Sequence, residues 1–299
     1  MHVLVTGGHG YLGSAVCRAL RMAGHSVSVL SRTGAGIDIR DRGAVAAYVR
    51  EGDFDAVCHL AAATRTRDSA VEPLAYFDVN AGGTLNLLLA LRRPVPFVLA
   101  SSSVVYGGRH AGALSEDLDP RPEGPYAASK ATAEQMVTAC AATGAVGAVV
   151  LRYFNVSGAV DGRGDTDTTR IIPNVFRAIT GELPHVTING DGSATRDFVH
   201  VADAADAMVK AVEGARLGEH RTYNVGSGTG VSMAEIIKCA EEVTGRSVPV
   251  RHNPPKPEPL RLVADVSRAR VGLEWEPHRS RVDGILTDAW AAWHHTQQV

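Results

Sequence analysis

A tyrosine and a lysine four residues apart are the first groups in this sequence that could do chemistry. Tyr126 and Lys130, in the segment YAASK, open a helix-like stretch at about 127–143. On a helix, the i, i+4 spacing places both side chains on one face. An ammonium beside a phenol stabilises the phenolate, which lowers the pKa of the phenol towards the range of a general base. The pair therefore indicates a base that removes a proton from a carbinol.

A serine-rich strand end supplies a third polar group. The segment FVLASSSVVYGG at 97–108 reads as a strand that runs into Ser102 and Ser103. In open α/β sheets, ligands bind in the crevice at the carboxyl ends of the strands. A serine hydroxyl there can bond the same substrate oxygen as the tyrosine, while a nicotinamide takes the hydride. Because YxxxK is common by chance, this interpretation depends on the glycine loop upstream.

That glycine loop follows the first strand-like segment directly. Gly7, Gly10 and Gly13 come after the run HVLVT and open an apolar helix. Glycine permits the tight turn and the close approach of a pyrophosphate, and the helix N-terminus offers N–H donors to the phosphates. The loop therefore predicts dinucleotide binding.

The end of the second strand leaves the choice between NAD and NADP open. An Asp or Glu usually binds the adenosine ribose there, but this sequence has Ser31, Arg32 and Thr33. Arg32 could pair with a 2′-phosphate, which favours NADP, or could stack on the adenine. Asp38 is the next acidic residue and could face the adenine from the following loop.

The elements that must position these residues alternate along the first half of the chain. Apolar runs without internal alternation are separated by helix-length stretches, which is typical of a parallel sheet covered on both faces. We therefore expect an α/β fold: a doubly wound parallel Rossmann sheet with a smaller mixed α/β C-terminal substrate domain. The apolar runs lie at 2–6, 26–30, 55–61, 95–101 and 146–151, and the helical stretches at about 11–23, 41–50, 71–92 and 127–143.

We expect two domains. Residues 1–155 are predicted to form the dinucleotide-binding domain and residues 156–299 mainly the substrate domain, because the alternating pattern weakens after Leu151. Segments around 186–210 and 222–228 are expected to return to the first domain.

Composition excludes several classes of function. With 30 basic and 32 acidic side chains, a net charge of −2 creates no field that would recruit nucleic acid or an anionic membrane. We expect no membrane segment and no signal peptide, and therefore a cytoplasmic protein. The four cysteines lie far apart, without a CxxC pair or a histidine at ligand spacing, so we expect reduced thiols and no metal site.

Taken together, the motifs resemble those of the extended short-chain dehydrogenase/reductases, over nearly the whole chain. Within that group the sequence is most similar to NAD-dependent nucleotide-sugar 4-epimerases of the UDP-glucose type. The motifs that carry the resemblance are TGGHGYLG (6–13), HLAA (59–62), NAGGT (80–84), SSSVVYG (101–107), YAASK (126–130), RYFNVSGA (152–159) and RDFVHVADAADA (196–207).

The resemblance implies a role for each matching residue. Tyr126 would remove the proton of the sugar 4-hydroxyl, Lys130 would bind the nicotinamide ribose, and Ser102 would bond the 4-oxygen, with Ser103 as the alternative. The implied cofactor-binding residues are Gly7, Gly10, Tyr11, Leu12, Gly13, Arg32, Asp38, Ile39, Leu60, Ala61, Ala62, Asn80, Lys130 and Tyr153. The implied substrate-binding residues are Ser103, Asn155, Arg170, Arg196, Glu258 and Arg261.

The sequence departs from the family pattern at three places. Ser31 and Arg32 replace the acidic residue expected for NAD, and Lys256 stands where the family often has an arginine, a role that Arg261 could take over. Arg170 stands where epimerases often have a smaller polar residue, so it either meets a sugar carboxylate or is a surface charge.

The resemblance implies an isomerase that removes a hydride at C4, lets the 4-keto sugar rotate and returns the hydride to the opposite face. A UDP-sugar substrate and a homodimer through helices such as 71–92 and 127–143 are implied with it. The alternatives are an NADPH-dependent 4-ketosugar reductase, a 4-epimerase of a UDP-uronic acid or UDP-2-acetamido sugar, and a cofactor sensor without catalysis. A 4,6-dehydratase is disfavoured because the segment at 102–104 lacks the Asp-Glu pair that reaction needs.

Overall fold

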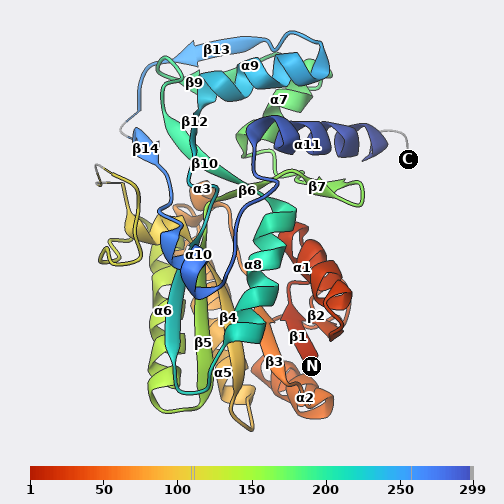
Figure 1. Cartoon of the computed structure of the whole chain (residues 1–299), viewed down its shortest axis with the longest axis vertical. Helices are drawn as coiled ribbons and strands as arrows, with labels where there is room; N and C mark the ends of the chain where they lie inside the picture. The colour runs from red at the N-terminus through yellow and green to blue at the C-terminus, as the bar shows by residue number, and fades with distance from the viewer. Residues whose placement is uncertain (109, 111, 257, 297–299) are drawn as a thin grey trace.

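A six-stranded parallel sheet is the largest element of this protein (Figure 1). The computed structural model describes residues 1–296 except 109, 111 and 257. The strand order is β11-β5-β4-β3-β1-β2, and all five neighbouring pairs are parallel. The strands are β1 (His2–Thr6), β2 (Ser26–Leu30), β3 (Ala56–His59), β4 (Val95–Ser102), β5 (Val146–Tyr153) and β11 (His220–Val225).

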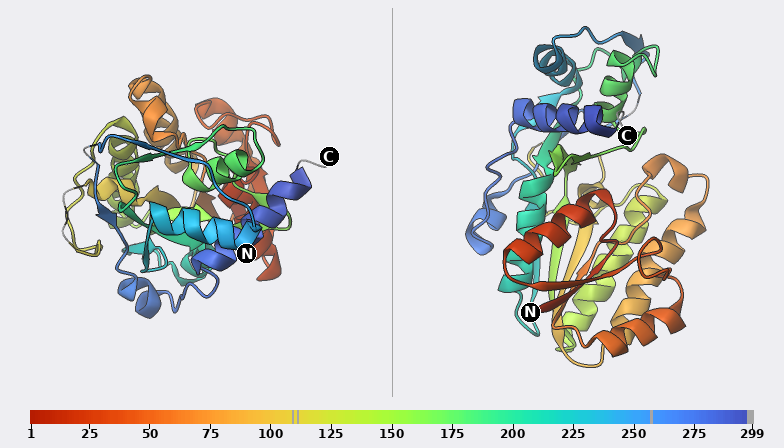
Figure 2. Two further views of the ribbon diagram at one scale, coloured as in Figure 1. Left: turned by 90° about the horizontal axis from the view of Figure 1, so that it is seen from above. Right: turned by 90° about the vertical axis from the view of Figure 1, so that its right-hand side faces the viewer.

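Helices cover both faces of this sheet, as Figure 2 shows. Val3 and Val5 point into one buried cluster, formed with α1 (Tyr11–Met22) and α8 (Val201–Gly214). Leu4 points into the other, formed with three helices. Because both faces are buried, the strands read as continuous apolar runs. The predicted doubly wound α/β fold is confirmed. The three helices of the second face are α2 (Arg42–Gly52), α5 (Gly83–Ala90) and α6 (Pro125–Ala142).

The single helix expected at 71–92 is instead broken into pieces. After α3 (Thr66–Ser69), the chain forms α4 (Pro73–Phe77), a π-helical turn η1 (Asp78–Gly82) and then α5. The side chain of Asn80 within η1 bonds both the N–H and the carbonyl of Ala63. π-helical turns of this kind often occur at functional sites, where they re-aim one side chain.

A second, smaller unit lies at the carboxyl end of the sheet strands (Figure 1). We call it the small unit; its core lies between three helices and two short sheets. Its helices are α7 (Ile171–Ile179), α9 (Met233–Thr244) and α11 (Val282–Thr296). One sheet pairs β6 (Asn155–Ser157), β10 (Thr195–His200), β12 (Gly230–Ser232) and β14 (Arg261–Leu262), and the other pairs β9 (Val186–Asn189) with β13 (Val250–Asn253). The remaining elements are the hairpin of β7 (Ala159–Val160) and β8 (Arg163–Gly164), the 3₁₀ turn η2 (Ser103–Tyr106) and α10 (Ser267–Gly272).

The chain crosses between the two units more than once. β11 is an edge strand of the six-stranded sheet, and α8 packs against α1. β9, however, pairs with β13 in the small unit. Residues 186–189 form β9 beside β13, and the expectation that segments around 186–210 return to the first domain stays a prediction. The two-domain division itself stays a prediction.

A crevice is expected where the connections leave the sheet in opposite directions. β1 is followed by α1 on one face, whereas β3, its neighbour, leads to α5 on the other. In open α/β sheets such a switch point creates a ligand-binding crevice at the carboxyl ends of the strands.

Candidate active site

A cleft of about 1020 Å³ lies at this switch point, between the sheet and the small unit. It brings together most of the residues predicted from the sequence. Those that line it are Gly7, Gly10, Tyr11, Leu12, Gly13, Arg32, Asp38, Ile39, Leu60, Ala61, Ala62, Ser102, Ser103, Tyr126, Lys130, Tyr153, Asn155, Arg170 and Arg196.

The glycine loop has the shape that a pyrophosphate requires. Gly7 has a φ of +71°, and a Cβ on Gly13 would lie 2.1 Å from the Gly7 carbonyl oxygen. Gly10 is the N-cap of α1 and offers no side chain to the first-turn N–H groups. These N–H groups are therefore available to an anion, and the bare backbone lets that anion approach. The residues present fit a dinucleotide.

Tyr126, Lys130 and Ser102 converge on this cleft from two elements. Pro125 starts α6, so Tyr126 lies in its first turn and Lys130 one turn later on the same side. Ser102 ends β4, where its hydroxyl accepts a hydrogen bond from the Val104 N–H at 3.4 Å. A helix start and a strand end thus hold the three polar groups on rigid backbone.

The electrostatics at Tyr126 differ from the expectation. Burial raises the pKa of the Tyr126 phenol, while a hydrogen bond with Ser102 and the charge of Arg170 act in the opposite direction. The Lys130 ammonium instead donates a hydrogen bond to the Ala100 carbonyl at 2.5 Å. Burial therefore outweighs the lowering expected for the pKa of Tyr126, and the role of Lys130 in that lowering stays a prediction.

A buried ionic cluster lies beneath Lys130. Burial lowers the pKa of Lys130 to about 8, and the charge of Glu134 opposes this shift. Glu134, one further turn along α6, accepts hydrogen bonds from Ser101 at 2.5 Å and from Arg152 at 2.7 Å. Tyr126, Lys130 and Glu134 therefore occupy successive turns of one buried helix face.

Basic and acidic side chains lie together at the end of the cleft where the adenosine of the cofactor is expected. Asp38 forms an ion pair with Arg40 at 2.8 Å, and these hydrogen bonds lower the pKa of Asp38 to about 2. The charge of Arg32 acts in the same direction. A carboxylate is therefore present beside Arg32, and it can accept hydrogen bonds from ribose hydroxyls as the missing acidic residue would.

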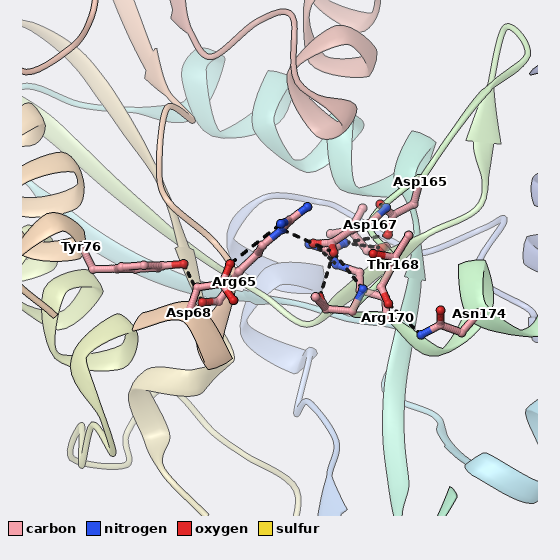
Figure 3. A network of polar contacts seen from close by, with 10 residues as sticks. Arg65, Asp68, Tyr76, Asp165, Asp167, Thr168, Arg170 and Asn174 are labelled. Atoms are coloured by element: carbon pink, nitrogen blue, oxygen red, sulfur yellow. Dashed lines mark hydrogen bonds and ion pairs between the residues drawn. The ribbon is translucent and has the colours of Figure 1, made fainter. Parts of the chain in front are cut away.

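The small unit supplies the opposite wall of the cleft. The Arg170 guanidinium lies 3.0 Å from Asp165. The guanidinium of Arg65, the residue before α3, lies 3.7 Å from Asp167. Figure 3 shows this network, in which the Tyr76 hydroxyl also donates to the Arg65 carbonyl at 2.6 Å. Charged side chains from both units therefore meet at the cleft.

Comparisons with known proteins agree with this geometry. Residues 3–226 match the NAD dependent epimerase/dehydratase family. The chain belongs to this family. A UDP-glucose 4-epimerase of Streptomyces lividans is 36% identical over 315 residues, which cover 97% of this chain and 95% of the relative.

Solved structures of UDP-glucose 4-epimerases have the same fold. One from Stenotrophomonas maltophila, with bound NAD and formylated UDP-arabinopyranose, has a TM-score of 0.91 at 31% identity and covers 100% of both chains. One from Brucella ovis in complex with NAD has a TM-score of 0.90 at 30% identity and covers 98% of each chain.

Three residues predicted for the site lie outside the cleft lining. Asn80 is 2% exposed and bonds Ala63 and Ser129, so it holds the loop after β3 in place without lining the cleft itself. Glu258 accepts a hydrogen bond from Arg196 at 3.1 Å. Arg261 is exposed on β14, which pairs with β10. Their direct contact with cofactor or substrate stays a prediction.

Two residues at the site were missed from the sequence. Asp165 lines the cleft beside Arg170, but its loop is polar throughout and no pattern singles it out. Glu134 could have been found, because it continues the four-residue spacing of Tyr126 and Lys130.

Two other kinds of feature are absent from the described part of the chain. Within the described part of the chain, no group of three or more His, Cys, Asp or Glu side chains could hold a metal ion. None of the described helices combines the length and apolarity needed to cross a bilayer.

Proposed function

We propose that this protein is an NAD-dependent 4-epimerase that interconverts UDP-glucose and UDP-galactose. One observation carries the proposal. Tyr126, Lys130 and Ser102 line the same cleft as the glycine loop, in a chain that aligns over 97% of its length with a UDP-glucose 4-epimerase. NAD, when bound, takes a hydride from the sugar C4 and later returns it.

The side chains of the cleft have two roles, proton transfer and binding. Tyr126 removes the proton of the 4-hydroxyl and gives it back, and Ser102 holds the 4-oxygen. Lys130 binds the ribose next to the nicotinamide, with Tyr153 beside it. Arg32, Asp38 and the loops at 7–13 and 60–62 hold the rest of the NAD.

Binding of the nucleotide must be firm, because the hexose has to turn between the two half-reactions. Asn155 and Arg196 lie on the small unit and would bind the UDP diphosphate. Arg196 is anchored by Glu258 at 3.1 Å and by the Pro259 carbonyl at 2.9 Å. Binding energy placed on the diphosphate, remote from C4, leaves the sugar free to turn.

The test is turnover of UDP-glucose by the purified protein without added nicotinamide nucleotide. Formation of UDP-galactose to equilibrium, without net oxidation or reduction of a nicotinamide, is the expected result. Stoichiometric consumption of NADPH with a 4-keto sugar nucleotide would instead identify a reductase.

Arg170 favours a second candidate substrate, a UDP-uronic acid. Its guanidinium lines the cleft, and its charge acts on the phenol of Tyr126, which supports a position near the sugar carbon that reacts. A uronate carboxylate at C5 is adjacent to C4 and suits an arginine. If UDP-glucuronate is the preferred substrate, Arg170→Met lowers kcat/KM for it far more than for UDP-glucose.

We further propose that the protein is a cytoplasmic homodimer. Val71 and Leu74 are 81% and 80% exposed, and Leu85 and Leu89 of α5 are 44% and 53% exposed. Large apolar side chains this exposed, on segments close together in the sequence, support an interface here. All four cysteines are free, which suits a reducing compartment. Light scattering of wild type and Leu89→Glu tests the dimer, and a wild-type monomer would refute it.

A further inference from the structure

A short hairpin of the small unit reaches across to the glycine loop. The hairpin consists of β7, β8 and the turn between them, and we call residues 158–164 the strap. Asp161 and Gly162 both have positive φ, 51° and 71°. This is the pattern of a tight two-residue hairpin turn, so the strap is a stiff unit rather than a loose loop.

Three contacts fasten the strap to the glycine loop and α1. The Tyr11 hydroxyl donates to the Gly158 carbonyl at 2.7 Å, and Arg18 pairs with Asp161 at 2.6 Å. The Arg163 guanidinium donates to the carbonyl of His9. All three partners belong to the glycine loop or to α1, and Gly158 and Gly164 also line the cleft.

The Tyr11 anchor does not depend on pH in the neutral range. Burial raises the pKa of the Tyr11 phenol, with the charge of Asp165 acting in the same direction and that of Arg170 against it. The phenol therefore stays a hydrogen-bond donor.

The strap lies between α11 and the glycine loop. A Cβ on Gly164 would lie 3.5 Å from the Ala292 side chain, so α11 lies directly behind the strap. On the other side, the His9 ring bonds Ser31 at 2.6 Å, which ties the loop after β2 to the same point. The strap can leave the glycine loop only by breaking its polar anchors.

We propose that the strap is a positioning element of the cofactor site, with Arg163 and Asp161 holding it closed so that the dinucleotide is retained from one turnover to the next. The proposal rests on the proposed function, because an epimerase reuses the same nicotinamide in both half-reactions and gains nothing from exchanging it. The anchoring residues act through the strap and the glycine loop, not on the reacting atoms.

The test is the rate at which bound NAD exchanges. Purified NAD-loaded protein is diluted into excess isotopically labelled NAD, and the nucleotide that remains bound is analysed by mass spectrometry after gel filtration. We expect Arg163→Ala to speed exchange about tenfold, the effect of losing one charge-assisted hydrogen bond. Arg18→Ala is expected to speed it about threefold, because that pair is half exposed.

Two controls separate the strap from a general loss of stability. Arg281→Ala removes an 85% exposed arginine that pairs with the nearby Asp283, and should leave exchange unchanged. The swapped pair Arg18→Asp with Asp161→Arg should exchange more slowly than either single variant.

Exchange in Arg163→Ala within twofold of wild type would overturn the proposal, as would a swapped pair no slower than the single variants. If the wild type binds NAD but does not epimerise UDP-glucose, the proposed function fails and the strap is still tested. If the wild type binds no nicotinamide nucleotide, both are overturned.

Discussion

The buried carboxylate beneath Lys130 provides a sharp test of the site's electrostatics. Glu134 and Arg152 form an ion pair at 2.7 Å, with side chains only 8% and 6% exposed. Arg152 Nη1 is buried and has no hydrogen-bond partner among the described residues, so the guanidinium depends on Glu134 for compensation. We consider the substitution Glu134→Gln, which keeps the shape of the side chain and removes its charge.

The expected cost follows from burial. Removing one partner of a buried ion pair costs about 3–5 kcal/mol, because the other charge is left uncompensated in a medium that solvates it poorly. The exposed pair of Arg281 and Asp283 is the matched control, with side chains 85% and 54% exposed. Asp283→Asn should therefore cost less than about 1 kcal/mol.

Urea unfolding followed by circular dichroism measures both changes. The double variant Glu134→Leu with Arg152→Met should lose less free energy of unfolding than the two single variants together, because neither charge is then left alone. A cost for Glu134→Gln as small as that of Asp283→Asn would refute the reasoning.

The other predictions concern catalysis. Tyr126→Phe should lower kcat by roughly 10²–10⁴-fold, the usual contribution of a positioned acid-base group, in a stopped assay of UDP-galactose formation. Gly13→Ala should abolish co-purification of NAD, measured by chromatography of the denatured protein, because its Cβ would lie 2.1 Å from the Gly7 carbonyl. Because burial raises the pKa of the Tyr126 phenol above its ordinary value, the phenolate that acts as the base is a minor species at neutral pH. We therefore expect kcat/KM to rise with pH across the alkaline range, and a profile that stays flat there would contradict this assignment.

The fold and the centre of the site follow from local patterns in the sequence. The apolar runs of β1, β3 and β4 predict a buried parallel sheet, and the three glycines after β1 predict the loop at its edge. The four-residue spacing of Tyr126 and Lys130 predicts that they share a helix face. Each of these inferences needs only one element or its direct neighbour.

Features that depend on distant contacts could not be predicted in the same way. The bond between Lys130 and Ala100 joins α6 to β4, 30 residues apart in the sequence. The side chain of Asn80, within the π-helical turn, bonds the backbone of Ala63, 17 residues earlier. The pairing of β9 with β13 and the three anchors of the strap also join remote segments, which periodicity does not reveal.

The central claim is that one hydride leaves C4 of the sugar and returns to it within the same cleft. The most direct measurement uses UDP-glucose deuterated at C4, incubated with the purified protein in ordinary water and analysed by NMR. We expect the UDP-galactose formed to retain deuterium at C4. Loss of the label to solvent, while UDP-galactose still forms, would contradict the account.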